Sequence, residues 1–153
     1  MPAHAKLARE IGLAVRELVL TDREMEAALA RRLGVGLTDV RAMEELVAQP
    51  GTLGPVELGK RLGITSASAT ALVDRLEVAG HLARRRHPDD RRRITLELTE
   101  SARADFRAAL GPLLASIGRI TAGLDPDRAA VIAAFLSDVT AAVRDFAAEN
   151  DAD

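Results

Sequence analysis

The sequence contains no cysteine, tryptophan or tyrosine, and three phenylalanines are its only aromatic residues. The absence of cysteine excludes disulfide bonds, thiol catalysis and thiol redox sensing by this chain. No apolar run reaches the roughly 18 residues that a membrane-spanning helix needs. The first residues lack the basic region and apolar stretch of a secretory signal. We therefore expect a cytoplasmic protein with no membrane contact.

Residues that could build a catalytic or metal site are scattered along the chain. The histidines, at His4, His81 and His87, do not have the spacing of metal ligands. There is no glycine-rich phosphate loop and no cluster of carboxylates or histidines at catalytic spacing. Asp89 and Asp90 are adjacent, but a turn explains this pair better than catalysis does. These absences predict no metal, no cofactor and no enzymatic activity.

Positive charge is concentrated in the middle of the chain. The whole chain has a formal net charge of −2, whereas residues 54–98 hold nine basic and six acidic residues, a net charge of +3. A basic segment in an acidic protein indicates a focused contact with a polyanion. On charge alone, a solvated hairpin edge explains the pattern equally well. Six arginines lie within ten residues: Arg84, Arg85, Arg86, Arg91, Arg92 and Arg93.

The segment TLGPVELGKRLGITSASATALVDRLEVAG predicts two short helices joined by a tight turn. Pro55 suits the first turn of the first helix, and Gly63 suits its C-cap. Thr65 is the expected N-cap of a second helix over residues 66–79, which Gly80 ends. This is helix-turn-helix geometry, although two helices of a plain bundle would have the same pattern. At 100° per residue the second helix has two faces: Ala69, Leu72, Val73 and Leu76 on one, and Ala67, Thr70, Ala71, Asp74 and Arg75 on the other.

After Gly80 the hydrophobic period changes from 3.6 to 2, which predicts a strand. The segment ITLELT alternates apolar and polar residues, and HLARRRH supplies an antiparallel partner. Pro88, Asp89 and Asp90 favour a turn between the two. An arginine-rich hairpin directly after a helix-turn-helix is the arrangement of a winged helix. Such a wing can place arginine in the minor groove of DNA while the second helix lies in the major groove.

The stretch LGITSASATALVDRLEVAGHLARRRHPDDRRRITLELTESA resembles the core of the multiple antibiotic resistance regulator (MarR) family. The family pattern falls on LVDRLE at residues 72–77, on Gly80, on Asp90 with Arg92, and on Leu98 with Thr99. The resemblance implies a mainly α fold with a small β-hairpin wing. It also implies a division into an N-terminal dimerisation helix (1–36), a winged helix-turn-helix DNA-binding lobe (37–99) and C-terminal dimerisation helices (100–153).

Two residues depart from the family pattern. Ala71 stands where many relatives have a basic or long polar residue, and Ala102 stands where they usually have glycine. The recognition helix therefore offers few hydrogen bonds to bases, and methyl contacts to thymine and hydroxyl contacts remain. Its candidate DNA contacts are Thr65, Ser66, Ala67, Ser68, Thr70, Ala71 and Arg75.

The wing supplies the other candidate DNA contacts. We expect Asp90 to hold the Arg92 guanidinium by a charge-assisted hydrogen bond and to aim it into a narrow minor groove. The remaining wing arginines are better placed for phosphates along the rim. These candidates are Arg84, Arg85, Arg86, Asp90, Arg91, Arg92 and Arg93.

The flanks predict long amphipathic helices. Residues 6–33 indicate one helix, with an alternative break at Thr21 or Asp22. A second helix is expected to begin at Thr38 as N-cap and to end before Pro50 and Gly51. Near the C-terminus, Gly111 and Pro112 should kink one helix, and Asp125 and Pro126 should open another. The apolar stripes of these two helices are Phe106, Leu110, Leu113, Ile117 and Ile120, and Val131, Phe135, Val139, Val143 and Phe146.

Such stripes must pack on something, either within the chain or across a homodimer as the resemblance implies. A two-fold dimer would place two recognition helices on a palindromic operator in double-stranded DNA. These expectations favour a DNA-binding transcriptional regulator, in particular a repressor released by a small molecule. A winged helix that binds protein and a small enzyme are the alternatives. The resemblance places an effector near Leu18, Met25, Met43 and Phe106, although each of these also reads as a core residue.

Overall fold

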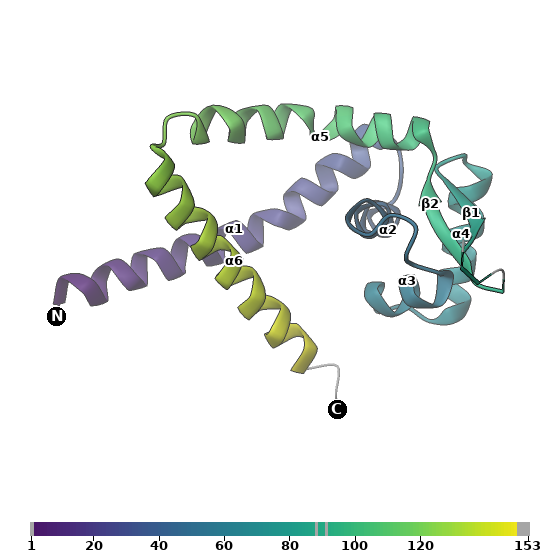
Figure 1. The fold of residues 1–153 in the computed structure, drawn as a ribbon, viewed down its shortest axis with the longest axis horizontal. Coiled ribbons are helices and arrows are strands. Elements are labelled where there is room, and N and C mark those ends of the chain that lie inside the picture. The colour runs from purple at the N-terminus through teal and green to yellow at the C-terminus, as the bar shows by residue number, and fades with distance from the viewer. Residues whose placement is uncertain (1, 88, 91, 150–153) are drawn as a thin grey trace. The chain divides into compact units, whose positions relative to one another are not determined.

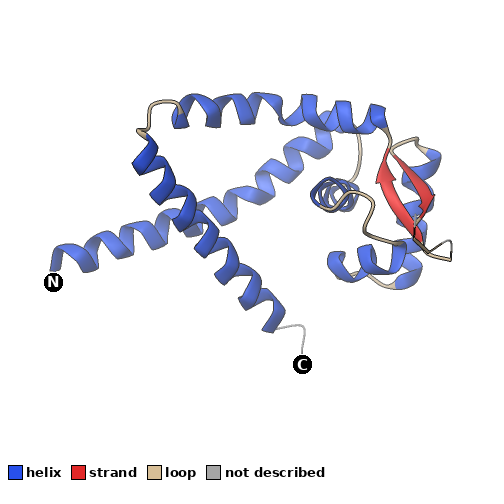
Figure 2. Ribbon diagram, viewed as in Figure 1, coloured by secondary structure: helices blue, strands red, loops and turns tan. Residues whose placement is uncertain are grey.

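The computed structural model describes residues 2–87, 89–90 and 92–149, and they form helices and one two-stranded hairpin (Figures 1 and 2). The predicted fold class, mainly α with a β-hairpin wing, is confirmed. The chain divides into two compact units, with the boundary between Leu110 and Gly111. In chain order the elements are α1 (Pro2–Leu33), α2 (Leu37–Ala48), α3 (Pro55–Leu62), α4 (Ser66–Val78), β1 (Leu82–Arg86), β2 (Ile94–Leu98), α5 (Glu100–Thr121) and α6 (Pro126–Glu149).

The helix-turn-helix is formed by α3 and α4, as predicted. Gly63 ends α3 in the left-handed conformation, with φ at 63°, a region that glycine adopts without steric cost. Gly59 lies at a close contact between the two helices. A Cβ added there would lie 2.8 Å from the Cβ of Ala69, so only glycine permits this packing distance. The short turn at Gly63 and the close contact at Gly59 together fix the position of α4 relative to α3.

The hairpin is antiparallel and packs beside α4, with Leu82 opposite Leu98 and Arg86 opposite Ile94 (Figure 2). The amide of Leu96 donates to the carbonyl of Leu53 at 2.8 Å, which ties β2 to the segment before α3. The first unit has one hydrophobic core beneath these elements, and Ile94, 47% exposed at the end of β2, lies outside it. Its most buried large side chains are Met43, Leu46, Leu58, Leu76, Leu82, Leu96, Val40 and Val73.

For the first helices, one sequence prediction is confirmed and one is wrong. The continuous helix predicted over residues 6–33 is present as part of α1. The alternative break near Thr21 is absent, because the Thr21 hydroxyl donates to the Glu17 carbonyl at 2.8 Å inside a continuous α1. Thr38 is not the N-cap of α2. That position is Gly36, whose amide donates to the Asp39 carboxylate at 3.0 Å. The Asp39 carboxylate, in the first turn, accepts from the amide of the N-cap residue itself, and this contact accompanies a helix that starts earlier than the threonine cap predicted.

The contact between α1 and α2 holds a partly buried group of charges. Arg41 of α2 makes a two-pronged pair with the buried Glu26 of α1, at 2.8 to 3.0 Å, and this hydrogen bonding raises the pKa of Arg41. Glu44 lies one turn further along α2. Burial, aided by the negative charges of Glu26 and Asp22, raises the pKa of Glu44 to about 7. Its proton is therefore held more tightly in the folded chain than in the unfolded one.

Glu44→Gln is expected to stabilise the protein at pH 8. Because the folded-state pKa of Glu44 lies above its ordinary value of 4.5, stability falls as pH rises from about 4.5 to about 7, and the penalty is complete above that range. Because Glu44 is only half-buried, solvent screens its charge, so the gain from the substitution should be on the order of 2 kcal/mol at pH 8, less than the full pKa shift would give, and should vanish near pH 4. Chemical denaturation at fixed protein concentration across this range measures it. The control is Glu24→Gln, at an exposed position of α1; an equal gain there would contradict the assignment.

The second unit consists of the C-terminal half of α5 and all of α6. Helix α5 continues through Gly111 and Pro112 without interruption. The predicted start of α6 is confirmed, since the Asp125 carboxylate accepts from the amide of Arg128 at 3.0 Å. None of the α6 side chains over residues 126–147 is buried. Large apolar side chains on this helix are exposed instead, among them Val131, Ile132, Phe135, Leu136 and Val143.

Candidate nucleic-acid interface

Helix α4 has the two faces that the sequence predicts. Thr65 is its N-cap, and its hydroxyl accepts from the amide of Ser68 at 3.2 Å. Ala69, Leu72, Val73 and Leu76 are buried in the core. The opposite face is exposed over Ser66, Ala67, Ser68, Thr70, Ala71, Asp74 and Arg75. This exposed face of small side chains can enter a groove without steric hindrance.

The strand register separates the wing arginines into two groups. Side chains alternate across a strand, so Arg84 shares a face of the hairpin with the buried Leu82 and Leu96, whereas Arg85 lies on the opposite face. Arg86 is exposed at the far end of β1. Three neighbouring arginines that look alike in the sequence therefore have three different surroundings.

Arg84 joins the wing to α4. One terminal nitrogen contacts Asp74 at 2.6 Å, and the other contacts Glu77, both on α4. The hydrogen bond to Asp74 makes the largest contribution to raising the pKa of Arg84, and the contacts with Glu77 raise it further. The Arg84 side chain is 29% exposed. The sequence predicts a phosphate contact for Arg84, whereas the structure pairs it with two carboxylates. The pairing makes it a positioning residue, because its charge is already neutralised.

Arg75 has a similar partner. Its guanidinium pairs with Asp39 of α2, a carboxylate that is 9% exposed and that also accepts from the amide of Gly36. The Arg75 side chain is 58% exposed, so part of it still faces solvent beside α4. The pair fixes α4 against α2. The sequence predicts only a DNA contact for Arg75.

The tip of the wing differs from the sequence prediction in one detail. Asp90 accepts from the backbone amide of Arg92 at 3.0 Å, and its own carbonyl accepts from the amide of Arg93 at 2.9 Å. The carboxylate therefore shapes the turn instead of holding the guanidinium. Arg92 and Arg93 are exposed and form no ion pair within the described part of the chain. The predictions for Pro88 and Arg91 lie outside the described residues.

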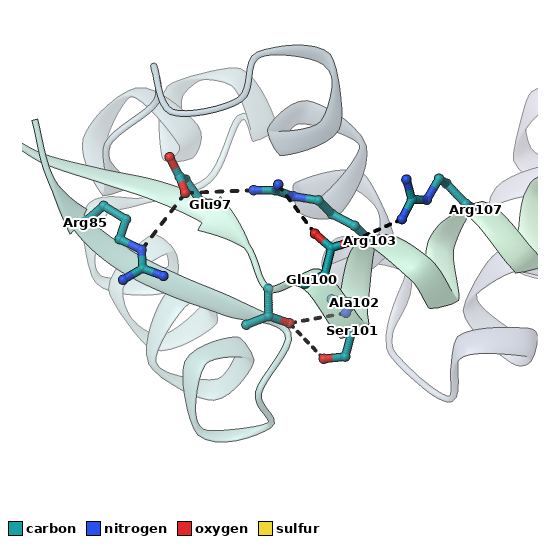
Figure 3. Close-up of polar contacts among 8 residues, drawn as sticks. Arg85, Glu97, Glu100, Ser101, Ala102, Arg103 and Arg107 are labelled. Carbon is teal, nitrogen blue, oxygen red and sulfur yellow. Dashed lines mark hydrogen bonds and ion pairs between the residues drawn. The ribbon is translucent and has the colours of Figure 1, made fainter. Parts of the chain in front are cut away.

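A chain of alternating charges links the wing to α5 (Figure 3). Glu97 of β2 lies between Arg85 of β1, at 4.0 Å, and Arg103 of α5, at 3.8 Å. Arg103 also approaches Glu100 at 4.0 Å, and Glu100 accepts a hydrogen bond from Arg107 at 3.2 Å. These pairs are exposed or half-buried, so each contributes little stability. Their effect is on the charge of the wing, because Glu97 partly neutralises Arg85.

The residues expected to form an effector pocket do not line a common hollow in the described structure. Leu18 is 63% exposed on α1, Met43 and Phe106 are buried, and Met25 packs at the edge of the core. Among the hollows of the first unit, two lie beside α2 and α5. One, of about 290 Å³, is lined by Arg32, Leu33, Met43, His81, Asp105, Ala108 and Ala109. The other, of about 240 Å³, is lined by Leu46, Val47, Pro50, Leu98, Arg103, Phe106 and Arg107.

Across residues 2–87, 89–90 and 92–149, no three histidine or acidic side chains gather closely enough to hold a metal ion. Within the same ranges, no helix combines the length and the apolar character needed to span a bilayer. The surface formed by α4 and the wing is thus the most distinctive chemical feature of the described chain.

Known proteins share both the sequence and the fold of this region. The MarR family model matches residues 33–93. An uncharacterized HTH-type transcriptional regulator of Bacillus subtilis, YcgE, is 37% identical over 86 residues, which are 56% of this chain and 55% of YcgE. The HTH-type transcriptional repressor YetL of the same species is 42% identical over 57 residues, 37% of this chain and 34% of YetL. The chain thus spans about half, or less, of the length of these curated relatives.

Solved structures extend the likeness to most of the chain. A MarR family protein from Bacillus stearothermophilus is superimposed with a TM-score of 0.70 at 16% identity, over 91% of this chain and 96% of the other. A mutant of S. aureus MepR bound to an oligodeoxyribonucleotide gives a TM-score of 0.55 at 18% identity, over 87% and 97%. At these low sequence identities, the similarity shows a shared fold and no more. Motif, sequence match and fold agree: residues 33–93 match the MarR family, and the chain has the fold of its winged helix-turn-helix proteins.

Proposed function

We propose that this protein is a sequence-specific, DNA-binding transcriptional regulator of the cytoplasm. The observation that carries the proposal is the surface described above, in which Arg84 holds an arginine-rich wing beside an exposed recognition helix. Helix α4 would lie in the major groove, and Arg92 would reach the adjacent minor groove. Arg86 and Arg93 would contact phosphates. The names of YcgE and YetL, and the oligodeoxyribonucleotide bound to MepR, support this assignment.

We further propose that the DNA-binding form is a homodimer. The exposed apolar side chains of α6 cover an extended surface, and soluble proteins rarely leave such surfaces without a partner. Residues 1–36 and 100–153 would form the dimer, and residues 37–99 would form the DNA-binding lobe. Two lobes related by a two-fold axis would read a palindromic operator.

Repression is the mode of action that we favour, with release by a small molecule. YetL is named a repressor, and the two hollows beside α2 and α5 are candidate effector sites. A ligand in either hollow would touch α5, through Asp105 or Arg103, and could shift the lobe against it. Thermal-shift screening of small molecules, followed by DNA-binding assays, tests this part separately.

The central test is selection of duplexes from a randomised DNA library by the full-length protein. We expect enrichment of a palindromic sequence whose half-sites are about one helical turn apart. Fluorescence anisotropy should then show tight binding to the selected duplex, weaker binding to a scrambled one, and a strong salt dependence of both. A protein-binding winged helix, the alternative function, would enrich no sequence and would bind the two duplexes equally weakly.

Glu97→Gln is expected to tighten DNA binding. Removing this carboxylate frees Arg85 for a phosphate, so affinity should rise several-fold and the salt-dependence slope should steepen by about one unit per protomer. Anisotropy titrations at several salt concentrations measure both quantities. Glu100→Gln changes the net charge equally but leaves the contact between Arg85 and Glu97 intact. If the two variants bind identically, Arg85 is not the group released.

A further inference from the structure

The exposed face of α4 presents methyl groups where a recognition helix usually presents hydrogen-bonding side chains. Ala67 and Ala71 are both exposed, and residues four apart lie on the same side of a helix, about 6 Å from one another along its axis. Thr70, also exposed, lies beside Ala71 and contributes a third methyl group. The centre of this face is therefore apolar, although it is fully open to solvent.

Most of the neighbouring hydroxyl groups already have partners within the helix. The Thr65 hydroxyl accepts from the amide of Ser68 at 3.2 Å and lies 2.9 Å from the Ser68 hydroxyl, to which it donates. The Thr70 hydroxyl donates to the carbonyl of Ser66 at 3.0 Å. A base that sought a donor from Thr65 or Thr70 would have to break one of these bonds, which reduces the net gain.

The charged residues that follow on the same face are engaged as well. Asp74 contacts Arg84 at 2.6 Å, and Arg75 pairs with Asp39. Bidentate recognition of guanine or adenine needs an unpaired Arg, Lys, Asn or Gln on the helix. Residues 66–78 contain no Lys, Asn or Gln, and their single arginine is Arg75. Apart from Arg75, which Asp39 already holds, this helix therefore has no side chain for the common bidentate contacts to guanine or adenine.

We propose that α4 reads its half-site through the C5-methyl groups of thymine, with Ala67 and Ala71 as the specificity-determining residues. This inference rests on the proposed DNA-binding function. Among the unmodified bases only thymine places a methyl group in the major groove, so methyl packing distinguishes T·A from the other pairs. The separation of about 6 Å between the two alanines matches two base steps of about 3.4 Å each. Each half-site should then contain two thymines that lie about two steps apart.

The experiment replaces thymine by deoxyuridine, which removes the methyl group and leaves the pairing edge unchanged. It uses the full-length protein and a duplex selected from a randomised library. Substitution at each of the two contacted thymines should weaken binding roughly fourfold, the expected effect of one buried methyl group. Deoxyuridine placed outside the half-sites is the control and should change the affinity by less than about 1.5-fold.

Variants of the two alanines assign the contact to the helix. Ala71→Ser puts a hydroxyl where the methyl group would pack, so the ratio of affinities for thymine and deoxyuridine at one position should fall towards one. Ala67→Ser should do the same at the other position. The matched control is Ala104→Ser, the same change at an exposed position of α5, which should leave both ratios at their wild-type values. Thermal melts of each variant confirm folding.

Three results would overturn the proposal. Equal binding of the thymine and deoxyuridine duplexes would show that the methyl groups are not read. A loss of affinity on 7-deazapurine substitution that exceeds the deoxyuridine effect would assign recognition to hydrogen bonds at purine N7. In both cases the protein still selects a sequence, so the proposed function stands. If no sequence is enriched at all, the proposed function fails and this inference fails with it.

Discussion

Replacing Ile132 and Phe135 of α6 by aspartate is expected to convert the proposed dimer into monomers. Burying a large apolar side chain contributes roughly 2 kcal/mol, and a two-fold axis counts each change twice. DNA affinity should fall on the order of a hundredfold or more, because each half-site would then be bound without its linked partner. Light scattering measures the mass, and anisotropy with the selected duplex measures the affinity.

The control for this prediction is Ser137→Asp. At 100° per residue, Ser137 lies on the side of α6 opposite the apolar stripe, so the same charge placed there should leave the mass and the DNA affinity unchanged. Because residues 126–147 of α6 have no buried side chain, neither variant should unfold the first unit, and circular dichroism checks this. A doubly substituted protein that keeps its dimeric mass would place the interface elsewhere.

Arg92→Ala is the second substitution with a large expected effect. It should weaken DNA binding by roughly 1 to 3 kcal/mol per half-site and relax the preference for A·T pairs beneath the wing. The reason is the position of Arg92 at the tip of the wing. Its side chain is exposed there, and Asp90 fixes the turn by accepting from the Arg92 amide. Titrations with the selected and scrambled duplexes at two salt concentrations separate loss of specificity from loss of charge.

Two further variants make the Arg92 prediction specific. Arg31→Ala removes an exposed charge of α1 and should leave affinity nearly unchanged. Asp90→Ala makes the wing more positive, so attraction to phosphates alone would predict tighter binding. We expect weaker binding instead, because the turn that presents Arg92 loses its acceptor. If Arg92→Ala binds the selected duplex as the unaltered protein does, the wing is a solvated hairpin.

The parts of the fold that depend on local chemistry could be predicted from the sequence. Gly63, Thr65 and Asp125 act on the backbone within a few residues of themselves, and their roles as caps are confirmed. The change of hydrophobic period at Gly80 likewise located the hairpin. Thr38 shows the limit of such reasoning. Threonine and aspartate both favour the start of a helix, and in the structure α2 has Gly36 as its N-cap, with the Asp39 carboxylate accepting from the Gly36 amide.

The parts of the site that depend on distant partners could not be predicted. Arg84, Arg85 and Arg86 are identical in the sequence, and only the pairing register and the position of α4 show that Arg84 faces Asp74 and Glu77. The spacing of those two carboxylates on one side of α4 is a weak signal that could have suggested a basic partner. The Arg75–Asp39 pair carries no such signal, because 36 residues separate its members.

The pairing of Arg84 also determines which segment would have to be moved to transfer the α4 surface to another protein. A designer who grafts residues 66–78 onto another winged helix to transfer its specificity would bring Asp74 and Glu77 without their cation. Two uncompensated carboxylates would then face the phosphates of the bound duplex and repel them. The smallest exchangeable unit is therefore the helix together with β1, and a chimera lacking an arginine at the Arg84 position should fail on every DNA sequence.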